Sequence, residues 1–82
     1  MIVIVEVMPK DGILDPQGVA VKKALHQLGY DEVKGVKVGK RILLDMETSD
    51  VELARKRAEE MGDKLLSNEN VEAFKVFIAE EI

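Results

Sequence analysis

The chain opens with a run of apolar residues that is typical of a covered β-strand. Residues 2–8 are rich in Val and Ile, which favour the pleated, packed surface of a sheet. Both alternating sets of this run are apolar except at Glu6, whereas a strand with one wet face alternates apolar with polar residues. We therefore expect residues 2–8 to form a strand that is covered on both sides.

A helix is predicted over residues 16–28. Asp15 can cap its first turn, and Pro16 suits the first helical position because its missing N–H would have no partner there. Gly29 is expected to end the helix in a left-handed conformation. Gly18 weakens the first turn, which suggests that another backbone passes close to it. One apolar stripe follows helical spacing: Val21, Ala24, Leu25 and Leu28.

Two apolar stretches, residues 33–38 and 42–47, are predicted to form a hairpin. Gly39-Lys40 suits a two-residue turn with glycine at its first central position. Strict alternation instead favours a three-residue loop over residues 39–41, because the apolar residues of both strands then share one face. These residues are Val36, Val38, Ile42, Leu44 and Met46. We favour the three-residue loop, since the apolar set on the second strand is strong.

A second helix and a last strand complete the chain. Ser49-Asp50-Val51-Glu52 has the form of a capping box, in which the serine and the glutamate each satisfy a free donor of the first turn. This helix should run to about Leu66, with a buried stripe of Val51, Ala54, Ala58, Met61 and Leu65. After a turn at residues 68–70, residues 72–80 should form a strand with Phe74, Val76 and Ile78 on one face.

The predicted order β-α-β-β-α-β is the ferredoxin-like arrangement. We expect one α+β domain over residues 1–82, with a four-stranded antiparallel sheet and both helices on one face. The opposite face would then carry part of an apolar set: Ile2, Ile4, Leu43, Phe77 and Ala79. A wet patch of this kind is unusual for a soluble monomer, so we expect the face to pair with a second copy or another subunit.

Composition narrows the chemistry that this chain can perform. Among 82 residues, 12 basic and 16 acidic side chains give a net charge of −4, which disfavours nucleic acid and anionic membranes as partners. The absence of cysteine and the single histidine, His26, exclude a disulfide framework, a thiolate nucleophile and a two-histidine metal site. No apolar run approaches the length of a membrane span. We expect a cytoplasmic protein without catalytic or metal-binding residues of its own, in which His26 faces outward.

Two loop features have a plain structural interpretation beside a functional one. Asp11 and Asp15 could act as paired carboxylates, but their spacing matches no calcium loop and Asp15 already caps a helix. Residues 35–41 resemble a phosphate-binding loop only faintly, because the glycine spacing is short and no helix follows. Their surroundings form a basic cluster, which is either a solvated hairpin or a docking site for an acidic partner or a phosphate: Lys34, Lys37, Lys40 and Arg41.

Several motifs resemble those of a known family. Residues 10–18, Lys-Asp-Gly-Ile-Leu-Asp-Pro-Gln-Gly, are similar to the signature loop and helix start of the PurS family, the small subunit of phosphoribosylformylglycinamidine synthase. The likeness continues through Leu28-Gly29-Tyr30, Val36-Lys37-Val38-Gly39-Lys40 and Leu65-Leu66-Ser67-Asn68. It therefore covers essentially the whole chain.

The resemblance implies a function in purine biosynthesis. The parent complex is an ATP-dependent, glutamine-hydrolysing ligase that uses ATP and magnesium, neither of which this chain is expected to bind. A glutaminase subunit releases ammonia and a synthetase subunit uses it. The small subunit forms a dimer or tetramer and bridges the two larger subunits for ammonia transfer.

The positions that match the family in loops and turns are the expected partner contacts: Asp15, Gly18, Gly39, Lys40 and Arg41. The alternative function is a regulatory module of the ACT type, which shares the β-α-β-β-α-β order. Such a module would bind a small ligand, such as an amino acid, at an interface between two copies through loop glycines.

Overall fold

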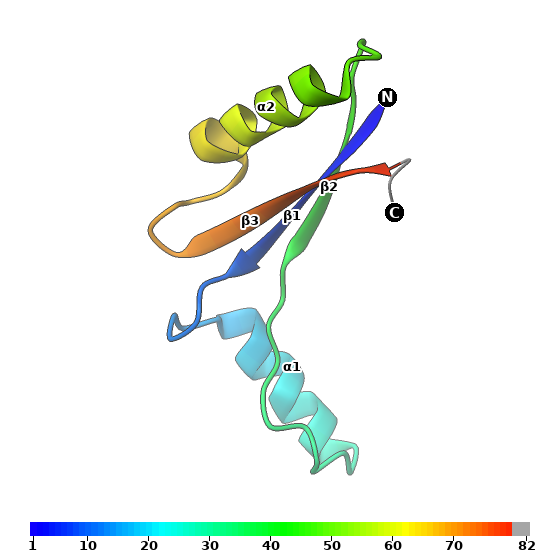
Figure 1. Ribbon diagram of the computed structural model, residues 1–82. Helices are drawn as coiled ribbons and strands as arrows, with labels where there is room; N and C mark the ends of the chain where they lie inside the picture. The colour runs from blue at the N-terminus through cyan, green and yellow to red at the C-terminus, as the bar shows by residue number, and fades with distance from the viewer. Residues whose placement is uncertain (80–82) are drawn as a thin grey trace.

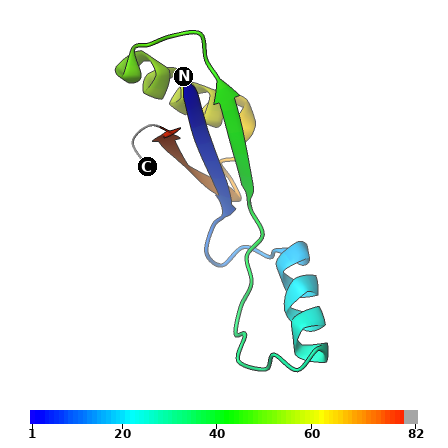
Figure 2. The same cartoon turned by 90° about the vertical axis from the view of Figure 1, so that its right-hand side faces the viewer.

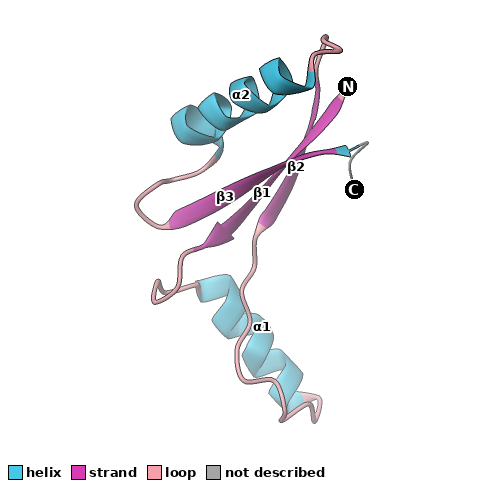
Figure 3. Cartoon of the chain, viewed as in Figure 1, coloured by secondary structure: helices cyan, strands magenta, loops and turns pink. Residues whose placement is uncertain are grey.

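The computed structural model describes residues 1–79. Its strands are β1 (Ile2–Pro9), β2 (Lys40–Asp45) and β3 (Glu72–Ile78), and its helices are α1 (Pro16–Gln27) and α2 (Val51–Met61). A π-helical turn, η1 (Gly62–Leu66), extends α2. The arrangement is shown in Figures 1 and 3. The predicted last strand agrees with β3 as far as Ile78, and its final residue, Glu80, lies outside the described residues.

The three strands form one antiparallel sheet in the order β2-β1-β3. The central strand is β1, and of its two faces only one is covered by a helix in the described residues, whereas both were expected to be covered. Its register aligns Val3 with Leu44 on β2 and with Ile78 on β3. Because side chains alternate between faces along a strand, this register separates the sheet into a face toward α2 and an open face.

The core lies between the sheet and α2. Val3, Val5 and Val7 from β1 are completely buried, together with Ala54 and Ala58 from α2. The small alanines let the helix approach the strands closely. The face of β3 that carries Phe74, Val76 and Ile78 packs against this core, as its alternation predicts.

The predicted hairpin between residues 33–38 and 42–47 is wrong. Residues 33–39 contain no strand, and β2 pairs with β1 instead. Gly39 lies against the Val7 carbonyl oxygen and the Met8 sulfur, and its φ is not positive, whereas the two-residue turn considered for Gly39-Lys40 needs positive φ there. The chain therefore continues in line with β2 instead of turning back (Figure 1), and the described sheet has three strands, not four.

The expectation of two helices on one face is also wrong. Only α2 covers the sheet, while α1 projects beyond its end (Figures 1 and 2). In the apolar stripe predicted for α1, Leu28 is 74% exposed, Val21 is exposed and Leu25 is half-buried. We call residues 16–39, which contain α1 and the returning segment, the arm.

The ends of α1 agree with those predicted from the sequence, whereas the ends of α2 differ from the prediction. Asp15 caps α1, and Gly29 follows it with a φ of +99°. At α2 the cap is Asp50, whose carboxylate accepts a hydrogen bond from the Leu53 N–H at 3.2 Å, so the capping box that starts at Ser49 does not form. The wider π turn shifts the helical period, and therefore Leu66 packs on the core while Leu65 is 81% exposed.

Candidate functional site

The base of the arm is held by the side chain of Asp15. Its carboxylate accepts hydrogen bonds from the Gly18 N–H at 3.1 Å and from the Val38 N–H at 2.9 Å. The bond from Val38, followed by that from Gly18, lowers the pKa of Asp15, because both favour the charged form. One carboxylate thus joins the start of α1 to the segment that returns toward β2.

Two glycines allow the backbones at this base to pack closely. A Cβ on Gly18 would overlap the Val36 carbonyl oxygen and lie 2.7 Å from the Asp15 carboxylate. The close approach expected at Gly18 is therefore confirmed, and the neighbouring backbone is that of Val36. A Cβ on Gly39 would overlap the Val7 carbonyl oxygen. Contacts within the chain thus account for Asp15, Gly18 and Gly39, and their contact with partners stays a prediction.

Lys40 and Arg41, the two charged candidates, point to opposite faces of the sheet. Lys40 is aligned with Val7, whose side chain faces α2, and its Nζ lies 3.9 Å from Glu72 Oε2. Arg41 is aligned with Glu6 on the open face. Both cations are exposed. They therefore cannot form one docking point, but they can serve contacts on two sides of the sheet.

The predicted basic cluster is divided by acidic side chains. Lys37 forms an ion pair with Asp11, and this hydrogen-bonded cation lowers the pKa of Asp11. Lys40 lies near Glu72, as described above, and Arg41 lies on the other face. The structure therefore does not gather these cations into a single phosphate-binding site.

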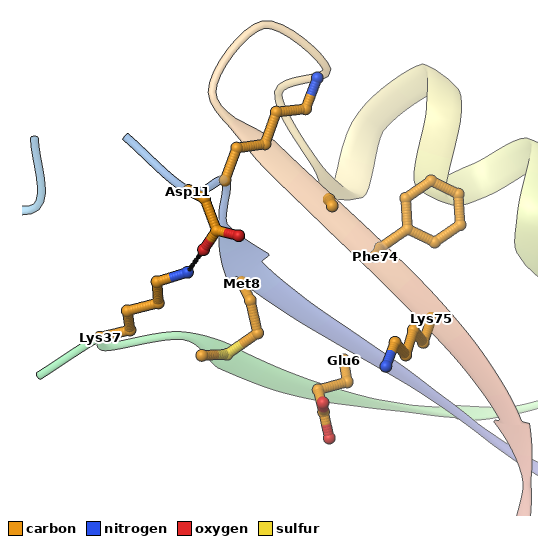
Figure 4. Close-up of a pocket in the computed structure, with 8 residues that line it drawn as sticks. Glu6, Met8, Asp11, Lys37, Phe74 and Lys75 are labelled. Atoms are coloured by element: carbon orange, nitrogen blue, oxygen red, sulfur yellow. Dashed lines mark hydrogen bonds and ion pairs between the residues drawn. The ribbon is translucent and has the colours of Figure 1, made fainter. Parts of the chain in front are cut away.

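The open face of the sheet carries an apolar row beside a charged row. Ile4 is aligned with Leu43 and Phe77, and it is buried while Leu43 is 59% exposed. One step along the strands, Glu6 is aligned with Arg41 and Lys75. A hollow of about 490 Å³ lies at the end of this face (Figure 4), lined by Glu6, Met8, Lys10, Asp11, Lys37, Ala73, Phe74 and Lys75.

The histidine that was expected to face outward is half-buried. A ring nitrogen of His26 lies 2.7 Å from the Val33 carbonyl oxygen, which joins the end of α1 to the returning segment. In residues 1–79, no group of three or more His, Cys, Asp or Glu side chains is arranged to hold a metal ion. No helix in that range is long and apolar enough to cross a membrane.

The feature that sequence reasoning missed is the unpaired backbone of the arm. In the described part of the chain, neither the N–H nor the C=O groups of residues 34–37 make a backbone hydrogen bond. The edge of β2 that faces away from β1 is also unpaired there. Alternation of apolar residues predicted that both stretches would pair, but it carries no information on whether they pair within one chain.

Comparison with known proteins gives one consistent family. The family model PurS, phosphoribosylformylglycinamidine (FGAM) synthase, matches residues 2–80. The PurS subunit of phosphoribosylformylglycinamidine synthase from Bacillus subtilis is 41% identical over 73 residues, which cover 89% of this chain and 86% of that protein. The range matched by the family model, residues 2–80, includes the sheet, α2 and the arm.

Solved structures agree with the sequence match. The crystal structure of PurS from Methanocaldococcus jannaschii, one of the subunits of formylglycinamide ribonucleotide amidotransferase, is similar with a TM-score of 0.81 and 33% identity, covering 93% of this chain and 92% of that one. A chain in the structure of PurLQS from Thermotoga maritima has a TM-score of 0.82 and 26% identity, covering 93% of both chains. This chain belongs to the PurS family of phosphoribosylformylglycinamidine synthase.

Proposed function

We propose that this chain is the small subunit of a phosphoribosylformylglycinamidine synthase of purine biosynthesis and that it supplies contact surface to the complex. The observation that carries the proposal is the PurS match over residues 2–80. The PurS subunit of this enzyme from Bacillus subtilis is 41% identical to this chain, and a chain of the PurLQS structure has a similar fold. The ACT-type alternative has no comparable support.

The role within the complex is to bridge the glutaminase and synthetase subunits so that ammonia passes from one to the other. ATP and magnesium serve the complex and are not bound by this chain, and the complex acts in the cytoplasm. The bridging role is supported by the placement of Lys40 and Arg41, exposed cations on the two faces of one thin sheet. A subunit with contacts on both faces can touch two partners at once.

The proposal includes self-association into a dimer or tetramer. Leu43 is exposed beside Ile4 and Phe77 on the open face, and two apolar residues of the arm are also exposed, Val21 on α1 and Leu28 directly after it. Apolar surface of this kind is favourable to cover. Large exposed side chains at both ends of the molecule support association with further copies.

Reconstitution with the cognate synthetase and glutaminase subunits tests the function. With the small subunit present, we expect glutamine to drive formation of formylglycinamidine ribonucleotide; without it, we expect only added ammonia to do so. Ammonia in solution bypasses the bridge, so this pair of reactions separates loss of transfer from loss of synthetase chemistry. Full glutamine-driven turnover in the absence of the chain would rule out the proposal.

Charge reversal tests the two predicted contact residues separately. Lys40→Glu and Arg41→Glu should each weaken capture of the larger subunits on the order of tenfold at low salt, because rim charges steer association. The fold should persist, since the exposed Lys40 to Glu72 pair is worth at most about 1 kcal/mol. Co-sedimentation measures capture, and circular dichroism monitors the fold. Unchanged capture by both variants would remove Lys40 and Arg41 from the contact surface.

A further inference from the structure

The hollow of about 490 Å³ at the end of the open face is built from three parts of the chain. Glu6 and Met8 come from β1 and Lys75 comes from β3, whereas Asp11 belongs to the loop after β1 and Lys37 belongs to the arm. Its volume is in the range of pockets that hold small molecules. We call this space the end hollow.

The loop and the arm at the edge of the end hollow are held in place by contacts within the chain. The Lys10 N–H donates a hydrogen bond to the Val71 carbonyl oxygen at 2.9 Å. The Asp15 carboxylate fixes the returning segment of the arm, and the ion pair of Lys37 with Asp11 joins the arm to the loop. The end hollow is therefore formed before a ligand arrives, and a preformed site loses less affinity to ordering.

The floor of the end hollow is apolar and separates two charged groups. Met8 is half-buried, and its neighbour across the ladder on β3 is an alanine. In Figure 4, Lys37 and Asp11 lie on one side of Met8. Glu6 and Lys75, which are aligned across β1 and β3, lie on its other side (Figure 4). A ligand that fills this space therefore needs charged ends and an apolar middle.

The charges around the end hollow have both signs, with an excess of one positive charge. Three lysines and two carboxylates line it: Lys10, Lys37, Lys75, Glu6 and Asp11. The Lys10 Nζ donates to the Glu69 backbone carbonyl oxygen, a neutral group that does not offset its charge. Within residues 1–79, the side chains of Glu6 and Lys75 make no hydrogen bond or ion pair. These charges are therefore available to a ligand.

This charge pattern disfavours simpler ligands. An anion without a positive group would lie close to two carboxylates, and a simple cation would lie close to three lysines, and like charges in contact oppose binding. A wholly apolar ligand would take water from Glu6 and Lys75 and give them no partner in return. The complementary ligand carries both signs and a net charge of about −1.

We propose that the end hollow binds a free amino acid with an acidic side chain. The α-ammonium group donates to Glu6 and the α-carboxylate accepts from Lys75, so the neutral end of the ligand meets the neutral pair. The methylene groups lie over Met8. The side-chain carboxylate accepts from Lys37, on the side where Lys10 supplies the excess positive charge.

This site goes beyond the proposed function, which assigns no ligand to this chain. It also differs from the ACT-type site, because the end hollow lies within one chain and no glycine lines it. Lys37 belongs to the arm while Glu6 and Lys75 belong to the sheet, so a bound ligand joins the arm to the sheet. Binding should therefore raise the melting temperature of the chain as ligand concentration rises.

A titration of the native chain with three related compounds tests the proposed ligand class. L-Glutamate has all three charged groups, L-glutamine has the same shape with a neutral side chain, and glutarate lacks the ammonium group. We expect glutamate to bind about tenfold more tightly than either, because each of the others loses a charge-assisted hydrogen bond. Amide chemical shifts in NMR spectra measure the affinity and show whether the perturbed residues are those of the end hollow.

Two variants test the residues assigned to the ligand. Lys75→Gln should weaken glutamate binding about tenfold, and Glu6→Gln should weaken glutamate binding without weakening glutarate binding, since glutarate has no ammonium group. Neither side chain has a partner in residues 1–79, so both variants should fold. The matched control is Lys34→Gln, which removes one positive charge outside the end hollow and should leave the affinity unchanged.

The remaining outcomes would overturn the proposal. No shift change at about 10 mM glutamate would exclude a Kd near 1 mM or below and with it the site. Binding of glutarate as tight as that of glutamate would rule out an amino acid as the ligand class. Equal weakening by Lys34→Gln and Lys75→Gln would show attraction by net charge alone.

Discussion

At the scale of single residues, the backbones at the base of the arm pack closely because two residues there are glycines, which have no Cβ. A Cβ on Gly18 would overlap the Val36 carbonyl oxygen, and a Cβ on Gly39 would overlap the Val7 carbonyl oxygen. Sequence alone gave a reason to expect the first contact, because a glycine in the first turn of a helix has a cost that only packing explains. It gave none for Gly39, since a glycine before a lysine is equally typical of a tight turn.

A Gly18→Ala substitution should therefore destabilise the chain. The added Cβ overlaps the Val36 carbonyl oxygen, and overpacking of this kind costs about 1–3 kcal/mol. Urea unfolding followed by circular dichroism measures the change. The matched control is Gly35→Ala, where nothing lies within 4 Å of the new methyl group and a gain of up to about 1 kcal/mol is expected. Equal effects at the two positions would contradict the close packing at Gly18.

The stability of the arm should depend on pH through Asp15. Its folded-state pKa is lowered by the Val38 and Gly18 hydrogen bonds, so its contribution is complete above the unfolded value of 3.8 and is lost as pH falls through the lower folded value. Asp15→Asn should flatten this part of the stability curve, because an amide does not titrate. Urea midpoints measured in steps below pH 5 test this. A variant that loses stability in acid as steeply as the native chain would contradict the assignment.

At the scale of elements, the sequence predicted the type of each element, helix or strand, better than it predicted which elements pair or pack with one another. The Val- and Ile-rich composition identified β1, and alternation identified β3 with the face that carries Phe74, Val76 and Ile78. The second helix was predicted well up to Met61, after which the π turn moved Leu66 into the core in place of Leu65. A change of helical period depends on what the turn packs against, and the local sequence does not contain that information.

The π turn is positioned by a contact with β3. Gly62 is buried, and a Cβ on it would lie 2.5 Å from the nearest atoms of the Phe74 ring. Gly62→Ala should cost about 1–3 kcal/mol, and the cost should fall in a Phe74→Leu background, where the ring is gone. A double-mutant cycle in urea should give a coupling of about 1 kcal/mol. Additive effects would show that the turn does not depend on this contact.

At the scale of the whole molecule, the hairpin prediction failed because strand patterning does not identify the partner of a strand. Strand alternation reports which backbones need a partner, and residues 33–38 and the edge of β2 were both identified as needing one. Whether that partner is in the same chain depends on the path at Gly39, where the contact with β1 keeps the chain straight. The prediction of the contact residues has the same limit. Lys40 and Arg41 are adjacent in the sequence, but they point to opposite faces of the sheet.

If the proposed self-association stabilises the arm, stability must depend on protein concentration. Unfolding of a dimer releases two chains, so by mass action each tenfold dilution should lower the apparent free energy of unfolding by about 1.4 kcal/mol per dimer. Thermal or urea midpoints of the native chain over a hundredfold range of concentration measure this. Constant midpoints for the native chain would mean that the arm is stable alone, although nothing in residues 1–79 covers its exposed apolar side chains at Val21 and Leu28.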